Sequence, residues 1–162
     1  MHWADYTAQR LMERGTEQVS ASGITPSGEF HIGHLREILS AEMIHRACLD
    51  AGMSSKYVFI VDSMDPLRRV YDFLSPDYEE YIGCPLAFIP APGDDGSPGD
   101  GSVTYADYFL APFLESLEQI GVRPEVVMNH ETYEEGLFAE YIDSAITNRE
   151  EIREIIQRIS GR

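Results

Sequence analysis

The stretch that decides the fold is Ala21-Ser22-Gly23-Ile24-Thr25-Pro26-Ser27-Gly28-Glu29-Phe30-His31-Ile32-Gly33-His34. A loop of small residues ends in two histidines three positions apart, and apolar residues recur at helical spacing directly afterwards. We interpret the stretch as a strand, a turn and the beginning of a helix. Such junctions bind phosphate in α/β proteins, because the first helical N–H groups are free and lie at the positive end of the helix dipole. The stretch therefore predicts a nucleotide-binding site.

The composition bounds the class of protein. The 162 residues suffice for one domain with a hydrophobic core, and 43% of them are hydrophobic. No apolar run approaches the length of a membrane span, and no charged-then-apolar leader opens the chain. Cys48 and Cys84 show neither a pairing pattern nor a metal-ligand pattern. These features predict a cytoplasmic protein with no membrane partner and no protein-bound metal.

The chain is strongly acidic. It has 28 Asp and Glu residues against 12 Lys and Arg residues, which gives a formal net charge of -16, and Lys56 is its single lysine. An acidic surface repels phosphate backbones, so we expect no broad nucleic-acid binding by this chain. We interpret the charge as a solubility feature.

The spacing of apolar residues predicts alternating helices and strands. The expected helices cover residues 3–14, 31–51 and 105–120, with two further helical faces at 138–146 and 152–159 and Asn148 as a candidate cap. The expected strands cover residues 18–21, 57–61 and 125–128. The second strand is a continuous apolar run, which is typical of a strand that is covered on both faces. A short helical or turn segment is expected from Asp65 to Leu74.

Residues 75–104 are predicted to be an irregular insertion with a flexible acidic loop at 93–102, because prolines and glycines break the periodicity. The alternation around this insertion predicts an α/β fold with a parallel sheet and right-handed crossovers. Ligands of such sheets bind beyond the carboxyl ends of the strands. The first predicted strand ends at the glycine-rich loop and the second at Asp62, so both segments are expected at the same edge.

Several residues of the loop have a chemical reason to be there. Gly23 and Gly28 have no Cβ, so backbone and ligand can approach closely, and Pro26 fixes one turn dihedral. Gly33 in the first helical turn costs up to about 1 kcal/mol relative to alanine. That cost is reasonable if a flat ligand packs against the helix backbone.

His31 and His34 are predicted to lie on one helix face, where their N–H groups can donate to phosphate oxygens and stabilise developing negative charge. A zinc site would need a third ligand, and no His/Cys cluster offers one. The histidines at positions 2, 45 and 130 are interpreted as ordinary surface or core residues.

These residues resemble a known signature. His31-Ile32-Gly33-His34 is similar to the HIGH motif of class I aminoacyl-tRNA synthetases, and Thr25-Pro26-Ser27-Gly28 resembles its usual extension. The archaeal-type class I lysyl-tRNA synthetases show further similar segments in the same order, at residues 1–5, 23–28, 35–39, 65–71, 78–86 and 148–156.

The resemblance implies a Rossmann-like (HUP-type) fold in which residues 1–162 are the N-terminal part of the catalytic domain and the first half of a larger nucleotide-binding domain. The second half with its KMSKS loop and the anticodon-binding region are absent from this sequence, so we expect these residues to be inactive alone. Residues 52–56 look superficially like that loop, but they come too early, and we interpret them as a helix-to-strand turn.

The resemblance also implies a reaction. ATP, as Mg-ATP, and lysine give lysyl-adenylate and pyrophosphate, and the lysyl group then passes to tRNA(Lys). The implied catalytic residues are His31 and His34. The implied ATP-binding residues are Pro26, Ser27, Gly28, His31, Ile32, Gly33 and His34, and the implied lysine-binding residues are Gly23, Thr25 and Asp62.

Neighbouring polar residues have structural alternatives. At a strand end, Asp62 and Asp65 could attract an ammonium group. Strand termination is the alternative for Asp62, and helix capping is the favoured interpretation of Asp65. Arg68 and Arg69 are interpreted as structural residues or surface ion pairs.

Two other classes of function stay open. One is a different nucleotidyltransferase with an HxGH-type site, such as an adenylyltransferase, whose small domain would be complete at this length. The other is a non-catalytic, synthetase-like binding module. A KMSKS-like loop downstream of residue 162 would discriminate between these alternatives and a synthetase.

Overall fold

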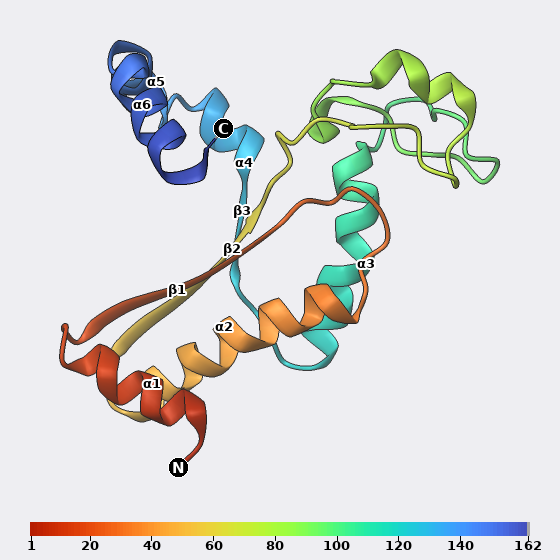
Figure 1. Ribbon diagram of the computed structural model, residues 1–162. Coiled ribbons are helices and arrows are strands. Elements are labelled where there is room, and N and C mark those ends of the chain that lie inside the picture. The colour runs from red at the N-terminus through yellow and green to blue at the C-terminus, as the bar shows by residue number, and fades with distance from the viewer. Residues whose placement is uncertain (162) are drawn as a thin grey trace. The chain divides into compact units, whose positions relative to one another are not determined.

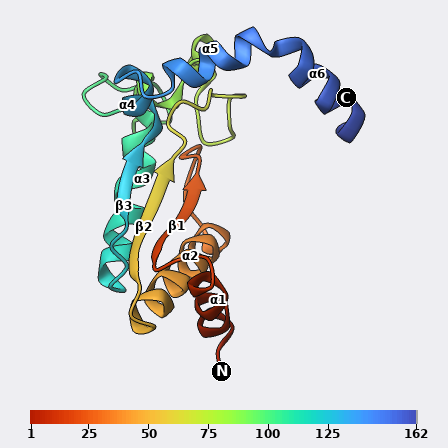
Figure 2. The same cartoon turned by 90° about the vertical axis from the view of Figure 1, so that its left-hand side faces the viewer.

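A computed structural model describes residues 1–161. These residues divide into two compact units, one over Met1–Asn129 and one that begins at His130. The first unit is built on three strands: β1 (Glu17–Ile24), β2 (Ser54–Val61) and β3 (Glu125–Met128). They pair in parallel in the order β1-β2-β3, and their arrows run in one direction in Figure 2. Ile24 pairs with Val61, which pairs with Met128, so the three carboxyl ends lie at one edge. This arrangement confirms the predicted Rossmann-like α/β fold.

Three helices belong to the same unit (Figure 1): α1 (Trp3–Met12), α2 (Ile32–Asp50) and α3 (Tyr105–Gln119). All three were predicted within three residues of their bounds. The side chain of His2 caps α1 by accepting the Ala4 N–H at 3.3 Å. Gly52 follows α2 with a left-handed φ of 80° and turns the chain toward β2. The predicted turn over residues 52–56 is shorter than expected, because β2 already begins at Ser54.

The main core lies on one face of the sheet. Tyr57, Phe59 and Val61 alternate along β2 and are buried against α2 and α3. Val58 and Ile60 point to the other face and are partly exposed, so the prediction of a strand covered on both faces is correct for one face only. The reason is the strand order, because two right-handed crossovers that step in the same direction place both helices on the same side.

β1 is longer than predicted, since it continues through Gly23 and Ile24. These residues pair in register with Ile60 and Val61, and the pairing extends the strand to the edge where the site lies. Sequence periodicity alone ended the strand at residue 21, because a glycine weakens a strand pattern.

Residues 62–104 are irregular but packed. Residues 65–74 form turns, and two short 3-10 helices follow, η1 (Pro76–Tyr81) and η2 (Leu86–Phe88). A second core cluster lies beneath them, and its fully buried members include Leu67, Tyr78, Leu86 and Tyr105. In the acidic loop, the Ser97 side chain and backbone donate hydrogen bonds that lower the pKa of Asp95, and Ser102 does the same for Asp100.

The second unit contains α5 (Ala139–Thr147) and α6 (Arg149–Ser160), which follow one another along the chain and contain no buried residue. The short α4 (Asn129–Glu134) begins at the unit boundary and was not predicted. Asn148 occupies the cap position of α6 as predicted, but its side chain does not cap the helix. Its Nδ2 donates instead to the Ser144 carbonyl at 2.8 Å, because φ and ψ of −99° and 18° lie outside the extended region of an N-cap. Within the part of the chain that is described, no helix has the length and apolar character to cross a membrane.

Candidate functional site

His31 and His34 cap the beginning of α2 with their imidazole rings. The Gly33 N–H donates to Nδ1 of His31 at 3.0 Å, and the His31 N–H donates to Nδ1 of His34 at 3.0 Å. The two rings stack with their centroids 3.9 Å apart. Because each Nδ1 accepts a hydrogen bond, the proton of each neutral ring is assigned to Nε2. The sequence prediction that the first N–H groups are free is therefore wrong at Gly33, and the site offers two Nε2–H donors instead.

The glycine at position 33 has a structural cause. A Cβ there would lie 2.8 Å from Cε1 and 2.9 Å from Nδ1 of His31, so only glycine leaves room for the capping ring. The sequence assigned this glycine to a flat ligand, whereas the structure supplies the His31 ring as the neighbour. Burial lowers the pKa of His34 and the adjacent His31 lowers it further, which favours the neutral form of the ring.

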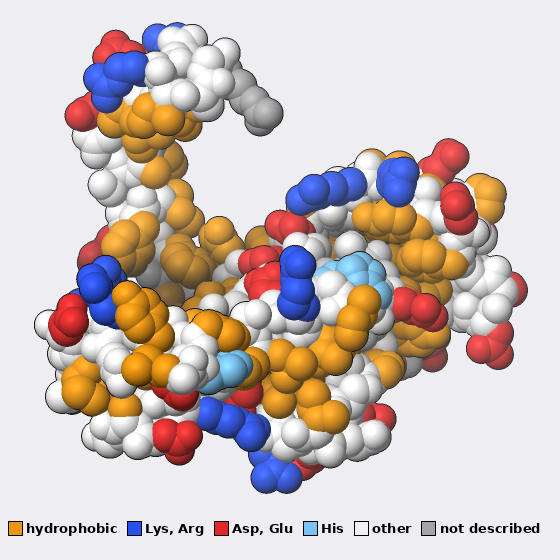
Figure 3. All heavy atoms as spheres, turned by 60° about the horizontal axis from the view of Figure 1, so that its bottom comes forward, with side chains coloured by type: hydrophobic (Ala, Val, Ile, Leu, Met, Phe, Trp, Pro, Cys, Tyr) orange, Lys and Arg blue, Asp and Glu red, His pale blue; other side chains and the backbone are white. Residues whose placement is uncertain are grey.

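A cavity of about 360 Å³ opens at the carboxyl ends of β1 and β2. Four predicted site residues line it: Gly23, Thr25, Ser27 and His34. Glu37, Asp65 and Arg68 line it too. On the face in Figure 3, histidine side chains lie at the surface next to a basic side chain. The cavity therefore combines imidazole, carboxylate and guanidinium groups.

Hydrogen bonds connect the lining residues. Oε1 of Glu37 accepts the Gly23 N–H at 3.2 Å, which ties α2 to the end of β1. The Thr25 hydroxyl donates to Oδ2 of Asp65 at 2.7 Å. Asp65 is thus a cavity residue in a turn, and its interpretation as a helix cap is wrong because residues 65–74 form no helix. Sequence reasoning did not single out Glu37, although it lies three positions after His34 on the same helix face.

Asp62 follows β2 and lies beside Gly23 without lining the cavity. Its Oδ1 accepts a hydrogen bond from Nδ2 of Asn129 at 3.2 Å, and its Oδ2 would be 3.7 Å from a Cβ at position 23. Burial raises the pKa of Asp62, and the nearby carboxylate of Asp65 raises it further. The carboxyl ends of β1 and β2 thus carry neighbouring acidic groups.

The other predicted nucleotide residues lie outside this cavity. Pro26 is fully buried, and the side chain of Ile32 is 78% exposed. A Cβ at Gly28 would make ordinary contact with the Phe73 ring at 3.5 Å. Over residues 1–161, no three His, Cys, Asp or Glu side chains gather in a way that could hold a metal ion.

The lining of a larger cavity, of about 720 Å³, includes the aromatic rings of Phe30, Phe73, Phe109 and Phe113. Phe30 stacks on Phe113 with the ring centroids 4.3 Å apart, and its ring is 5.0 Å from that of His34. The charged lining residues of this cavity are acidic, so it suits a phosphate group less well than the smaller cavity.

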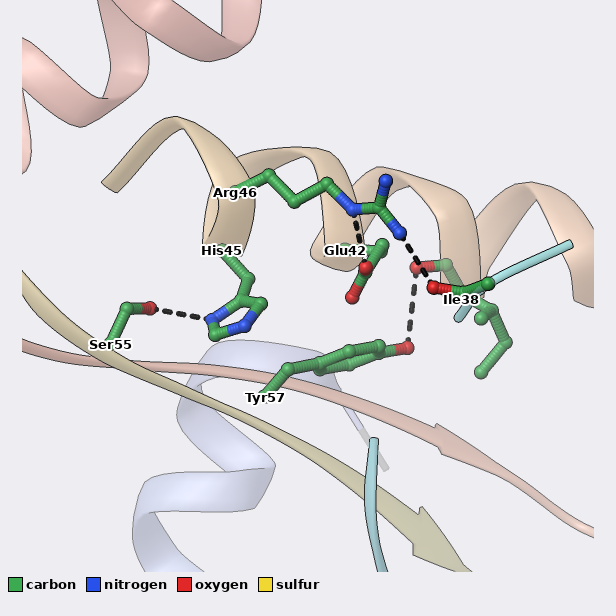
Figure 4. Close-up of polar contacts among 7 residues, drawn as sticks. Ile38, Glu42, His45, Arg46, Ser55 and Tyr57 are labelled. Carbon is green, nitrogen blue, oxygen red and sulfur yellow. Dashed lines mark hydrogen bonds and ion pairs between the residues drawn. The ribbon is translucent and has the colours of Figure 1, made fainter. Parts of the chain in front are cut away.

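A polar network behind the cavity holds β1, β2 and α2 together (Figure 4). The Tyr57 hydroxyl bonds Ser22 Oγ at 2.8 Å and donates to the Ile38 carbonyl at 3.2 Å, and burial raises the pKa of Tyr57 to about 12. Further along α2, Arg46 pairs with the buried Glu42 at 2.6 Å. Because Ser22 precedes Gly23, this network fixes the strand end against the helix that carries the cavity's glutamate.

The profile of the family described as "tRNA synthetases class I (K)" matches residues 1–162. The chain belongs to this family. The class I synthetase resemblance seen in the HIGH-like residues is thereby confirmed over the whole chain.

Curated members of this synthetase family match along the whole chain. The chain is 46% identical over 162 residues to the lysine–tRNA ligase of Archaeoglobus fulgidus and 41% identical over 162 residues to lysine–tRNA ligase 1 of Methanosarcina acetivorans. It is 42% identical over 161 residues to the lysine–tRNA ligase of Picrophilus torridus. These matches cover 99–100% of the chain but 29–32% of the relatives, so the chain spans about a third of their length.

Proposed function

We propose that this chain is the N-terminal part of the catalytic domain of a class I lysine–tRNA ligase and binds ATP and lysine. The observation that supports this function best is the cavity at the carboxyl ends of β1 and β2, with His34 beside the carboxylates of Glu37 and Asp65. Family membership and the relatives' names support the choice of amino acid. The cytoplasm is the proposed location, because tRNA is used there and both cysteines are free thiols.

In the proposed reaction, the carboxylate of lysine attacks the α-phosphorus of ATP and pyrophosphate leaves. The lysyl group of the adenylate then passes to the terminal ribose of tRNA(Lys). Because the carboxylate is already ionised at neutral pH, the first step needs no general base. The contribution of the protein is to position the reactants and to stabilise charge.

His31 and His34 are the proposed catalytic residues. Their Nε2–H groups donate to phosphate oxygens of ATP and stabilise the charge that develops as pyrophosphate leaves. The hydrogen bonds by which His31 and His34 cap α2, here called the reciprocal cap, support this role. They fix both rings and leave Nε2 as the donor. Burial lowers the pKa of His34, which favours the neutral ring that carries the Nε2–H donor.

The remaining proposed ATP-binding residues are Pro26, Ser27, Gly28, Ile32 and Gly33, which shape the loop before α2 and its first turn. Magnesium is proposed to enter as Mg-ATP, bound through the phosphates. Mg²⁺ in such sites is held largely by substrate phosphates and water.

Gly23, Thr25 and Asp62 are the proposed lysine-binding residues, and we add Glu37 and Asp65. Carboxylates in a partly enclosed cavity attract ammonium groups. Free lysine carries two ammonium groups, one at Cα and one at the end of its side chain. Burial raises the pKa of Asp62 most, and the neighbouring carboxyl groups of Asp65 and Glu37 raise it further, a repulsion that a bound cation would relieve.

The test is amino-acid-dependent exchange of pyrophosphate into ATP by the complete gene product that contains this chain. We expect lysine to support exchange well above glutamate, tryptophan and tyrosine. Preference for one of those three would contradict the lysine assignment. Exchange without any amino acid would instead favour another HxGH nucleotidyltransferase. No ATP binding by calorimetry would favour a non-catalytic module.

Calorimetry on residues 1–162 tests the phosphate role separately. We expect weak ATP binding that is lost when both His31 and His34 are replaced by alanine. Equal ATP affinity of the two proteins would remove the proposed role of the histidines.

A further inference from the structure

The cavity holds charges of both signs. Glu37 and Asp65 contribute carboxylates, and Arg68 is the only lysine or arginine among the described residues that line it. A ligand that carries only positive charge would compete with the guanidinium of Arg68 for Asp65, whose Oδ2 lies 3.3 Å from Nη2 of Arg68. A ligand with an ammonium group and an anionic group separated by a few bonds would match both signs.

Arg68 is held in place by a carboxylate that is itself anchored. Its Nη2 lies 3.3 Å from Oδ2 of Asp65, the same oxygen that accepts the Thr25 hydroxyl at 2.7 Å. The backbone of Asp65 is fixed as well, because its N–H donates to the Asp62 carbonyl and its carbonyl accepts the Leu86 N–H. Asp65 therefore orients the guanidinium from a rigid turn.

The rest of the guanidinium is available to a ligand. The Arg68 side chain is 72% exposed, and a guanidinium presents five N–H donors in a planar fork. That fork matches the two oxygens of a carboxylate and two oxygens of a phosphate equally well. The neighbouring Arg69 is placed differently, with its guanidinium carbon 5.2 Å from the centre of the Tyr71 ring and outside the cavity lining.

The charges around Arg68 favour a carboxylate over a phosphate as its ligand. A triphosphate carries several negative charges, which would face Glu37 and Asp65 across the same cavity. An amino-acid carboxylate carries one negative charge and arrives with an ammonium group that those carboxylates attract. We infer that Arg68 binds the α-carboxylate of the amino-acid substrate, an inference that rests on the proposed function.

This role predicts a particular kinetic effect. The substrate carboxylate is charged before adenylate formation and is converted to a neutral acyl-phosphate linkage by it. The contact with Arg68 is therefore strongest in the ground state, and its loss raises KM for the amino acid more than it lowers kcat.

The experiment uses the complete gene product, with Arg68→Gln as the test variant and Arg69→Gln as the matched control. The ligands are lysine and cadaverine, the same diamine chain without the carboxylate, which is measured as an inhibitor of pyrophosphate exchange. Arg68→Gln is expected to raise KM for lysine about 10- to 100-fold, the effect of a lost charge-assisted hydrogen bond. The inhibition constant of cadaverine and KM for ATP should stay within about twofold, and Arg69→Gln should change none of the three.

Arg68→Lys keeps the charge without the planar fork, and we expect it to restore part of the lysine affinity. An unchanged KM for lysine in Arg68→Gln overturns the inference. So does an increase in KM for ATP alone, which would assign Arg68 to a phosphate, or an equal loss of lysine and cadaverine, which would indicate a collapsed cavity. A wild-type protein that activates no lysine would refute the proposed function itself, and the inference would fall with it.

Discussion

The ring of His31 lies directly over Gly33, so that a methyl group at position 33 would come within 2.8 Å of its Cε1. The same glycine donates its N–H to Nδ1 of that ring at 3.0 Å. The conformation of His31 therefore depends on the absence of a side chain two residues later.

Gly33→Ala is expected to displace the His31 ring while leaving the fold intact. Alanine is favoured in a helix by up to about 1 kcal/mol, and loss of the cap costs about the same, so the free energy of unfolding should change little. ATP-dependent exchange should fall about 100-fold or more, the effect of one lost oxyanion donor. Urea denaturation and exchange kinetics measure the two quantities, and Ser40→Ala on the same helix is the control. Full activity in Gly33→Ala would show that the ring position does not matter for the reaction.

The folded protein should become less stable as His34 is protonated. Burial lowers the pKa of His34 below its usual value, so the folded state resists the proton more than the unfolded chain does. The stabilisation is complete above about pH 6.5 and is lost as the pH falls toward the lowered pKa. Urea denaturation between about pH 7 and pH 5 should show this loss, and His34→Asn should reduce the slope because asparagine does not titrate. Identical slopes in both proteins would count against a lowered pKa.

Tyr57→Phe should destabilise the first unit. The change removes the bonds to Ser22 and to the Ile38 carbonyl and leaves both buried groups without this partner. A cost of about 1–3 kcal/mol in the free energy of unfolding follows. Tyr6→Phe on the exposed face of α1 is the matched control and should stay within about 0.5 kcal/mol. Ser22→Ala combined with Tyr57→Phe should cost less than the sum of the two single changes, since an apolar pair leaves fewer unsatisfied groups.

Gly23→Ala should affect ligand binding more than stability. The added Cβ would make ordinary contacts at 3.7 Å with Asp62 and with the Ile60 carbonyl, so the strand tolerates it. The methyl group would nevertheless occupy space at the edge of the cavity. We expect a higher KM for lysine with a nearly unchanged unfolding transition, measured by exchange kinetics and thermal denaturation. A variant with wild-type KM would place the amino acid elsewhere.

Much of the fold could be predicted because its signals are local. The bounds of β3 were predicted to the residue. The carboxyl ends of α1, α2 and α3 were predictable because a glycine follows each apolar pattern. The position of His31 and His34 at the beginning of α2 was also evident from the glycine-rich loop. Local patterns cannot show which face of the sheet two helices share, because that depends on strand order.

The contacts that build the cavity join distant segments, and the sequence did not show them. Thr25 and Asp65 are forty positions apart, and only the folded turn brings the hydroxyl and the carboxylate together. Arg68 follows the same turn. In the sequence, it is visible only as a basic residue three positions after an acidic one. Its predicted ion pair is present, with Asp65 as the partner, but its place in the cavity is not visible in the sequence.

The reciprocal cap of α2 constrains the choice of amino acid at position 31 twice. The near nitrogen of the His31 ring starts the helix, while the far nitrogen is turned away from that bond and holds the proton. Starting a helix alone would admit serine, aspartate or asparagine, each of which carries a suitable acceptor. Only a side chain with an acceptor on one side and a donor on the other meets both demands, and among the natural residues the imidazole combines them in a rigid ring. His31→Asn would thus separate the two demands, because it keeps the acceptor near the backbone and deletes the outward donor.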